Sequence, residues 1–501
     1  MLVYIKAFVV LSGFFVIAST LNRFFHGKDL DELGFFGVNT KKIIIVWLSI
    51  TACVFVLQSI WLLYIGVIVA SLSLRKNPDN DVLWFVFFLL IMPLYEAHIP
   101  GFAGIEYLLG VSYLSIVSLC FLFPKFLEFK NDKSKTPFGQ LFQDKCIVIL
   151  YLLVIFQGFR DNASVTGSVK LALVAFFEVI VPYAVISRLS IDKKILDSVF
   201  VVILLTGLFG ALVNVFEFLR GWQLYRGTSF IVGSSSITES TFMYRGGYLR
   251  ASSLFVHSIV NGYFMVVSLG AWYFCAKRFS PSFLFKYGTL FLLLAGLYCT
   301  SSRGPWVGAA LFFVVVTVFL GKNRFRNLAY LGVFGLVSVF GLILLGQKER
   351  FLELLPFIGK EGVDSYRSKL IENGLEVFYR NPLLGQSSGK YLNEPEMLAL
   401  IQGEGIIDIV NNYIALLLDY GLFGFLPYVL LFLSLMIAVN RVRKNSDDRT
   451  FLVSSVLIGL SISHLFIMGT VKDLGHIKPL SYMILAMMVG VGVLPKLRGA
   501  K

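Results

Sequence analysis

The chain has 501 residues, of which 57% are hydrophobic, 15% aromatic and only 15% charged. Because a soluble globular protein carries about 25% charged residues, this composition excludes a cytosolic or secreted globule, a disordered chain and a disulfide scaffold. It indicates a membrane protein that crosses the bilayer many times. The net charge of +14 does not argue for a nucleic-acid partner, because Lys and Arg of such proteins accumulate on cytoplasmic loops.

Apolar segments long enough to cross a bilayer run along the whole chain. The first, residues 2–20, lacks a small-residue cleavage site and is predicted to be a retained helix. Residues 43–72 are long for one helix and short for two, so both alternatives stay open and the total is roughly 14 or 15 spans. The other predicted spans are 82–96, 105–124, 145–158, 169–187, 196–217, 252–275, 286–300, 305–321, 328–346, 422–439, 451–469 and 479–495.

Strict alternation back from the basic C-terminus places the other basic loops together on one side, which the positive-inside rule makes cytoplasmic. These loops contain Arg75–Lys76, Lys125 to Lys135, Lys193–Lys194, Lys277–Arg278, Lys322 to Arg326 and Arg441 to Lys444. The N-terminus then lies outside if residues 43–72 form a hairpin and inside if they form one helix. The predicted class is an all-α, polytopic transmembrane helical bundle with one large periplasmic loop that contains short helices.

The same alternation divides the chain into five parts and places two polar insertions outside. The parts are N-terminal transmembrane helices at 1–217, a first periplasmic loop at 218–251, central transmembrane helices at 252–346, a large periplasmic loop at 347–421 and C-terminal transmembrane helices at 422–501. Function is expected in the large loop, because loops this long usually carry it. No internal repeat relates the two halves, which disfavours a secondary transporter.

Arginines on the outer side run against the positive-inside rule and therefore need another explanation. They are Arg220, Arg226, Arg245, Arg250, Arg303, Arg350, Arg367 and Arg380. A guanidinium presents a planar fork of donors that matches phosphate oxygens, so outer arginines at a membrane surface favour a membrane-bound anion such as a lipid diphosphate. The alternative for a loop arginine is that it is solvated or pairs with a loop carboxylate such as Glu349, Glu353 or Glu372.

Four short motifs, taken in order, resemble those of the O-antigen ligase and O-antigen polymerase (Wzy-type) superfamily. They are Arg250-Ala-Ser-Ser-Leu-Phe-Val-His257 with Asn261-Gly262, Ser301-Ser302-Arg303-Gly304, Tyr366-Arg367-Ser368 with Asn381-Pro382-Leu383-Leu384-Gly385, and Asn411-Asn412-Tyr413 with Asp419-Tyr420-Gly421-Leu422-Phe423-Gly424. The Pro100-Gly101-Phe102 turn and the Phe216-Glu217-Phe218 triplet are similar to the exopolysaccharide-polymerase branch. One position departs from the pattern: the superfamily often has His immediately before the Asn, whereas this chain has Val410.

The resemblance implies a glycosyltransferase whose arginines hold the diphosphate of a lipid-linked donor. Catalytic candidates are Arg303, Arg367, Arg250, Asp408 and His257, and substrate-binding candidates are Arg380, Asn411, Tyr413 and Glu217. Because Val410 cannot accept a proton, either another group acts as the base or this branch relies on positioning and electrostatics. The candidate bases are Glu404, Asp408, His257 and His476. His257, seven residues beyond Arg250, is expected two helical turns away on the same face.

Each of these candidates also has a structural alternative. His257 could serve packing, and Asp408 and Asn411 could cap helices. Gly385, Gly421 and Gly424 are expected to serve turns and close packing rather than chemistry. The intramembrane carboxylates Glu178 and Glu217 are expected to pair with outer arginines.

The sequence thus predicts a metal-independent, inverting glycan polymerase of the bacterial inner membrane whose active site faces the periplasm. No cofactor is expected, since the chain has no HExxH motif, outer DxD pair or phosphate-binding loop. The expected partners are polyprenyl-diphosphate-linked oligosaccharide donor and acceptor, membrane lipids, and chain-length regulator and export proteins, with no nucleic acid. A ligase that transfers the finished glycan to lipid A core or protein is one alternative. A lipid-linked oligosaccharide flippase is the other.

Overall fold

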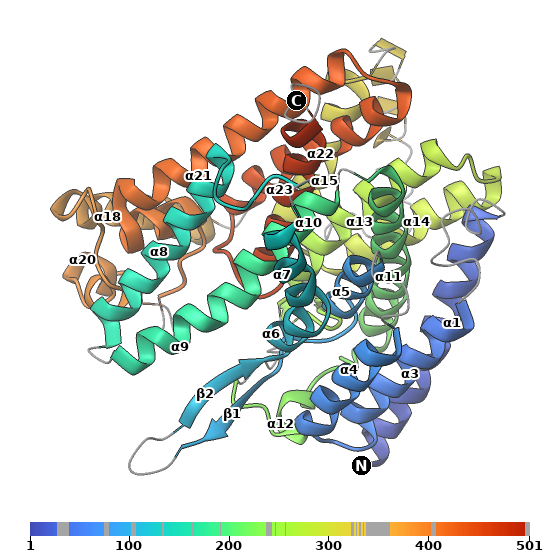
Figure 1. Ribbon diagram of the computed structural model, residues 1–501, viewed down its shortest axis with the longest axis horizontal. Coiled ribbons are helices and arrows are strands. Elements are labelled where there is room, and N and C mark those ends of the chain that lie inside the picture. The colour runs from blue at the N-terminus through green and yellow to red at the C-terminus, as the bar shows by residue number, and fades with distance from the viewer. Residues whose placement is uncertain are drawn as a thin grey trace.

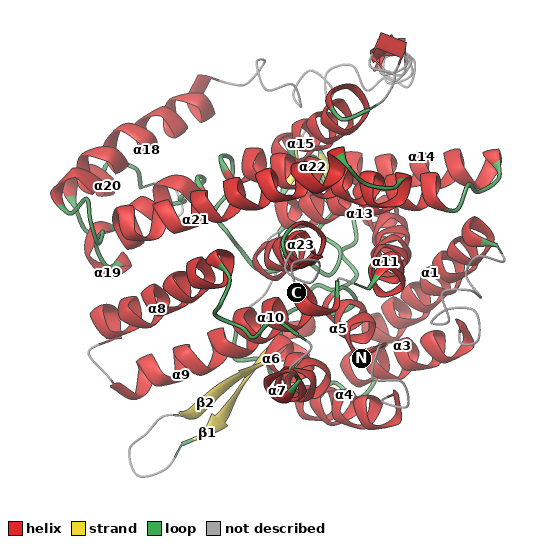
Figure 2. Ribbon diagram, turned by 45° about the horizontal axis from the view of Figure 1, so that its top comes forward, coloured by secondary structure: helices red, strands yellow, loops and turns green. Residues whose placement is uncertain are grey.

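The computed structural model of the chain describes residues 1–27, 40–74, 80–101, 107–132, 135–162, 165–190, 192–236, 243–245, 247–255, 257–321, 361–401 and 407–495, with short pieces between 325 and 336. Nearly all the regular structure in these residues is helical (Figures 1 and 2), which confirms the predicted all-α polytopic class. Seven helices among them are long and apolar enough to cross a membrane. The predicted span 328–346 lies mostly outside the described residues.

The N-terminal segment resolves the open alternative at residues 43–72. Two helices, α3 (Thr40–Phe55) and α4 (Ile60–Leu74), are joined by a short turn at 56–59. Helix α1 (Leu2–His26) begins beside the loop predicted at 218–251, here called the first long loop, where the Tyr4 hydroxyl approaches Gly227. The other end of α1 meets the opposite end of the bundle, where the His26 ring lies 4.9 Å from the Phe279 ring. Residues 43–72 therefore form a hairpin, and the N-terminus lies at the same end as that loop.

Residues 82–96 and 105–124 were predicted as two spans, and this prediction is wrong in part. Helix α5 (Asp81–Leu89) is short, and the chain then forms an antiparallel hairpin of β1 (Glu96–Pro100) and β2 (Tyr107–Ser112). The helix ends at Leu89, and Pro93 disfavours a helical conformation at Met92, so the helix does not resume there. After the hairpin the chain crosses back as α6 (Tyr113–Val117), the π-helical η2 (Ser118–Leu122) and α7 (Phe123–Asn131).

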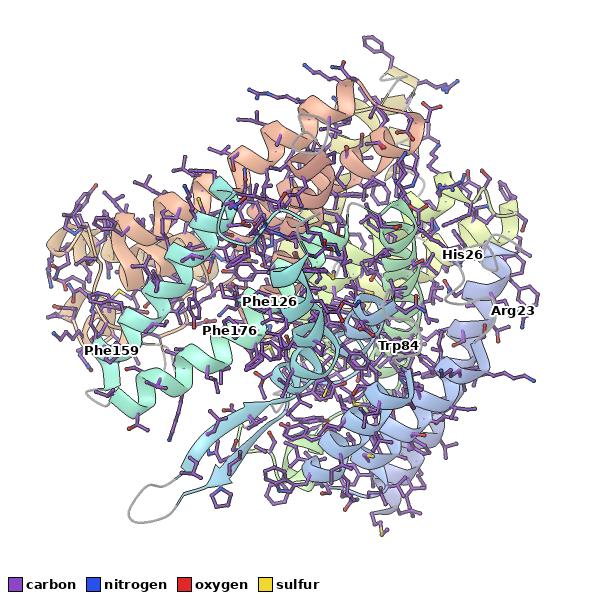
Figure 3. The ribbon with its side chains drawn as sticks, in the orientation of Figure 1. Arg23, His26, Trp84, Phe126, Phe159 and Phe176 are labelled. Atoms are coloured by element: carbon purple, nitrogen blue, oxygen red, sulfur yellow. The ribbon has the colours of Figure 1, made fainter. Side chains whose placement is uncertain are left out.

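The core of the bundle is built around α11 (Lys193–Arg220), which packs against α1, α5, α13 (Ser258–Arg278) and α14 (Phe283–Cys299). All nine side chains of α5 are buried, and Figure 3 shows its Trp84 among the crowded side chains of the interior. The remaining core helices are α10 (Val181–Leu189), α15 (Arg303–Val314) with η4 (Val315–Phe319), α22 (Asp448–Met468) and α23 (Ile477–Gly492).

Several helices on one side of the bundle lead to the large loop. Helix α8 (Phe142–Asn162) packs against α9 (Val165–Ala175) and against α21 (Asn412–Lys444), and η3 (Phe176–Ile180) joins α9 to α10. Phe159, 48% exposed, lies near the far tip of α8 (Figure 3). The described part of the large loop holds the short helices α18 (Glu361–Arg380), α19 (Ser388–Tyr391) and α20 (Pro395–Leu398) around a small apolar core of its own.

Ion pairs bring described parts of the predicted basic loops together at one end of the bundle, here called the basic end. Asp197 on α11 accepts hydrogen bonds from Arg278 after α13 and from Arg449 at the start of α22. Lys193 lies 3.4 Å from Asp447, just beyond the end of α21. The opposite end, here called the loop end, carries the β1–β2 hairpin, residues 221–257 and the turn between α14 and α15. The agreement between loop charge and position supports the predicted alternation.

A buried ion pair at the basic end gives a test of this packing. The Arg188 guanidinium donates to both carboxylate oxygens of Asp144 at 3.0 and 2.6 Å, and both side chains are inaccessible to solvent. Asp144→Asn leaves the arginine charge buried without its partner, so we expect a loss of about 3–5 kcal/mol of stability. Thermal unfolding of the purified protein in detergent measures it.

The matched control is Glu128→Gln, which makes the same chemical change in the exposed pair that Glu128 forms with Lys125 at 2.8 Å. Exposed pairs contribute about 0–1 kcal/mol, so the control variant unfolds close to the wild-type temperature. Equal unfolding temperatures for the two variants would contradict the assigned packing of α8 against α10.

Candidate active site

The turn between α14 and α15, residues 300–303, gathers arginines from the first long loop. Arg245 donates from Nη1 to the Ser301 carbonyl at 2.7 Å. Arg250 donates from Nη2 to the Ser302 hydroxyl at 3.0 Å and from Nε to the Thr300 carbonyl at 3.5 Å. Arg303 is the first residue of α15, directly after these acceptors. Arg245, Arg250 and Arg303, which directly follows their acceptors in the chain, are here called the arginine cluster.

The backbone of this turn is shaped to meet the loop. Ser301 has a φ of 49°, in the left-handed region that non-glycine residues seldom adopt. The short strands β3 (Tyr244–Arg245) and β4 (Tyr248–Leu249) bring Arg245 and Arg250 to the same side of the turn. Such a sparsely populated conformation is characteristic of functional sites when other contacts hold it in place.

Crowding of like charge sets the electrostatics of the cluster. Burial lowers the pKa of Arg250 to about 9, and the neighbouring charge of Arg245 lowers it further in the same direction. The positive charges of the two arginines thus lie close enough to raise one another's energy. An anion placed beside them would relieve this repulsion, which makes the cluster a suitable site for a phosphate group.

His257 lies near the cluster, but not as the sequence predicts. Residues 250–255 are not helical, and His257 instead caps the start of α13 by accepting the Ile259 N–H at Nδ1 over 3.2 Å. Burial lowers the pKa of His257 to about 4, and Arg250 lowers it too. The ring is therefore neutral at pH 7 with its hydrogen on Nε2, which leaves Nδ1 engaged and makes His257 a poor base.

Glu217 holds the two ends of the first long loop together. Its Oε1 accepts the Leu224 N–H at 3.0 Å, and its Oε2 accepts the N–H groups of Ser252 and Ser253 at 3.1 and 2.9 Å. The side chain is fully buried. The expected arginine partner is therefore wrong, and three backbone donors take its place. Glu217 faces the protein interior and positions the residues beside Arg250 rather than reaching the surface.

Two asparagines that the sequence analysis did not select complete this support. Asn261 donates to Asn214 at 2.7 Å and to the Ala251 carbonyl at 3.0 Å, and Asn214 donates to the Gly296 carbonyl at 3.2 Å. These bonds join α11, α13 and α14 beneath Arg250. The Asn261-Gly262 pair, which is part of the resemblance, pointed to this position. Gly262 packs against Pro305 at the start of α15.

Glu178, in the π-helical η3, is likewise paired differently from the prediction. It accepts hydrogen bonds from the hydroxyls of Ser112 and Ser115 at the start of α6. Serine hydroxyls therefore satisfy this carboxylate where an outer arginine was expected. Lys478 on α23 is a positive charge that acts on it.

Arg367 and Asp408 form a second group in the large loop. The Tyr366 hydroxyl donates to the Asp408 carbonyl at 2.8 Å and accepts the Asp408 N–H at 3.1 Å. Burial raises the pKa of the Asp408 carboxyl, while the nearby Arg367 acts in the opposite direction. The structure thus brings these two predicted residues together, at a site separate from the arginine cluster.

Arg380 serves the large loop itself. Its guanidinium pairs with Glu394 at 2.6 Å, with Glu396, and with Glu376 at 4.0 Å. The carboxylates fasten the end of α18 to the start of α20. Pairing with loop carboxylates, the alternative considered for loop arginines, is the arrangement found at Arg380.

The large loop is anchored in a break of α21. Gly421 has a φ of 60° and interrupts the helix, and the freed N–H groups of Leu422 and Phe423 donate to the carbonyls of Pro382 and Leu383 at 2.8 and 3.1 Å. Gly385 fits against the same break, because a Cβ there would lie 2.5 Å from the Leu418 carbonyl oxygen. The expected backbone role of both glycines is confirmed, and Arg160 on α8 also holds the turn through the Leu384 and Gly385 carbonyls at 2.9 and 3.1 Å.

The start of α21 adjoins both the last loop and the start of α15. Asn411 caps the helix by accepting the Tyr413 N–H at 2.9 Å, the structural alternative considered for it, and the Tyr413 hydroxyl donates to the Leu465 carbonyl. Asn412 accepts the Asp473 N–H at 3.1 Å, and Thr470 packs against Gly304. Residues 469–476 thus connect the cluster side of the site to the large loop, a connection that no motif signalled.

Residues 288–429 match the family model described as O-antigen ligase. This range begins within α14 and ends within α21, and it includes Arg303, Arg367, Arg380, Asp408, Asn411 and Tyr413. Arg250, His257 and Glu217 lie before it and are linked to it by the contacts on residues 300–303. No curated protein matches the chain.

The interlock at Gly385 generates a prediction. In Gly385→Ala, the added Cβ meets backbone atoms of Leu418, Tyr420 and Gly421, and its φ of 63° is strained for alanine. The left-handed conformation alone costs about 1–2 kcal/mol, so we expect the large loop to detach and its amide hydrogens to exchange faster. Hydrogen exchange of residues 366–400, read by mass spectrometry, measures this.

Gly389→Ala is the control, because a Cβ there meets nothing within 4 Å and the residue has no positive φ. Unchanged exchange in both variants would contradict the anchoring of the loop at Gly385.

Proposed function

We propose that this chain, which matches the O-antigen ligase and polymerase superfamily over residues 288–429, is a polysaccharide polymerase that joins polyprenyl-diphosphate-linked repeat units. The product would be an exopolysaccharide, a capsule or an O-antigen. The reaction would take place at the loop end of the bundle, on the periplasmic face of the bacterial inner membrane.

The arginine cluster is the observation that carries this proposal. Arg245 and Arg250 are hydrogen-bonded to the residues that precede α15, and Arg303 begins that apolar helix. Cations held at the mouth of a membrane span suit an anion that is itself anchored in the membrane. A diphosphate on a polyprenyl carrier has this property, and its oxygens match the guanidinium fork.

The orientation rests on the basic end. Lys193, Arg278 and Arg449 lie there together, so the positive-inside rule places that end in the cytoplasm. The loop end, with the arginine cluster, would then face the periplasm.

The chemistry follows from the charge that develops in the reaction. The acceptor hydroxyl would attack the anomeric carbon of the donor sugar, and the bond from that carbon to the diphosphate would break, which inverts the carbon. Negative charge would collect on the departing diphosphate, beside the arginine cluster, and preorganised cations of this kind supply a large share of catalysis. Arg367 and the α18–α20 unit would close over the glycan from the large loop.

A ligase is the second candidate, because the matching family model is described as O-antigen ligase. Ligase and polymerase would share the donor and the arginine cluster and would differ in the acceptor. Val410, in place of the histidine that the superfamily often has there, favours the polymerase.

Replacement of the cluster tests the proposal. In Arg250→Ala and Arg303→Ala, the diphosphate loses charge-assisted hydrogen bonds of about 1.5–3 kcal/mol each, so we expect polymer formation to fall by roughly 10- to 100-fold. Single lipid-linked repeat units should accumulate on the outer leaflet. Chromatography of extracted lipid-linked glycans measures polymer and single units, and treatment of intact spheroplasts with a membrane-impermeant glycosidase before extraction identifies the leaflet. The control is Arg23→Ala, an exposed arginine near the basic end of α1 (Figure 3).

Other products would separate the alternatives. Long polymer left on the carrier lipid in the variants would favour the ligase. Repeat units retained on the inner leaflet would point to a flippase and would sink the polymerase proposal.

A further inference from the structure

Transfer to a hydroxyl group needs a base, and Val410 removes the one that the motif suggests. Most polar groups at the loop end are already engaged. Glu217 accepts three backbone N–H groups, His257 uses Nδ1 as a helix cap, and the Nε2 of His476 lies 3.1 Å from the Met92 carbonyl. Glu404 lies outside the described residues, so the base is sought among the other residues that the structure describes.

Asp473 lies where such a base is needed. It sits in the short loop 469–476 between α22 and α23, and Asn412, two residues after Val410, accepts its backbone N–H at 3.1 Å. Three residues earlier in the same loop, Thr470 packs against Gly304, the neighbour of Arg303. Asp473 thus occupies a loop that touches both the Arg303 helix start and the position of the missing histidine.

The Asp473 carboxylate does not use all of its hydrogen-bonding capacity within the described residues. Its Oδ1 is buried and has no hydrogen-bond partner in the part of the chain that the structure describes. The charged groups near Asp473 are Lys472 in its own loop and Lys478 on α23, and the tyrosines that face it are Tyr263 on α13, Tyr428 on α21 and Tyr482 on α23. A buried oxygen without a hydrogen-bond donor lowers the stability of the fold, so its presence calls for an explanation such as a catalytic role.

Burial raises the pKa of Asp473 to about 6, and the two lysines oppose that rise. A carboxylate with this pKa is ionised at neutral pH and binds a proton more readily than an ordinary aspartate. Asp419 is a weaker candidate, because Lys472 lies 3.5 Å from its carboxylate.

We propose that Asp473 contacts the acceptor hydroxyl and is the general base of the transfer, an inference that rests on the proposed function. Asp473 takes the proton of the hydroxyl as its oxygen forms the bond to the anomeric carbon of the donor. The bond from that carbon to the diphosphate breaks, and its electron pair leaves with the diphosphate beside the arginine cluster. The proton then passes from Asp473 to water.

Asp473→Asn tests the inference in the full-length protein in liposomes. The probe is the lipid-linked glycan extracted from host cells that lack this protein. We expect kcat to fall by about 10²- to 10⁴-fold with little change in KM. The wild-type rate rises with pH through about 6 as Asp473 loses its proton, and this rise should be absent from the residual rate of the variant. Glu128→Gln, the same change at the basic end, should keep the wild-type rate and profile.

A second variant gives an answer even if Asp473→Asn does not fold. Lys472→Gln removes a cation that favours the ionised carboxylate, so the rise in rate should move to higher pH. A rise that stays at the wild-type pH would overturn the inference.

The competing base is Asp408. Loss of activity in Asp408→Asn together with a normal rate and profile in Asp473→Asn would also reject Asp473. Failure of the proposed function is a separate result: the wild-type protein would then make no polymer from the lipid-linked glycan at any pH.

Discussion

The contact of Arg245 and Arg250 with residues 300–302 is the interaction on which the site depends. It draws a loop of more than thirty residues, between Gly221 and His257, onto the start of α15. Two arginines are thereby held on the residues that directly precede Arg303, the first residue of the apolar helix α15. Glu217, beneath them, offsets part of the cost by fixing the backbone at both ends of the loop. In the proposed function, an anion bound beside Arg245 and Arg250 would relieve the repulsion between their charges.

The second half of the site is assembled by a different device. A bundle in lipid cannot leave backbone groups unpaired, yet α21 is broken at Gly421. The turn around Gly385 supplies the missing acceptors, so the break and the large loop stabilise each other. Arg160 adds two bonds from α8. The large loop, which carries Arg367 and Asp408, is consequently fixed to the broken helix α21.

Charge and hydropathy predicted the helical bundle and its two ends, because these features depend on membrane energetics that act on each segment separately. The roles of Arg250 and Arg303 stay predictions. The β1–β2 hairpin was missed, since a continuous apolar run looks the same in a buried helix and a buried strand. The pairing of Arg380 depends on carboxylates brought near by folding. Asp473 was not selected either, because a single aspartate in a short turn carries no pattern until Asn412 and the nearby tyrosines surround it.

The central claim is that the arginine cluster binds a lipid-anchored diphosphate, and direct binding tests it most simply. Undecaprenyl diphosphate can be titrated into nanodiscs that contain the full-length protein, with undecaprenyl monophosphate as the comparison. The account predicts that the diphosphate binds more tightly than the monophosphate and that Arg250→Ala weakens diphosphate binding by about 10-fold or more. Equal affinity of wild type and Arg250→Ala for the diphosphate would contradict it.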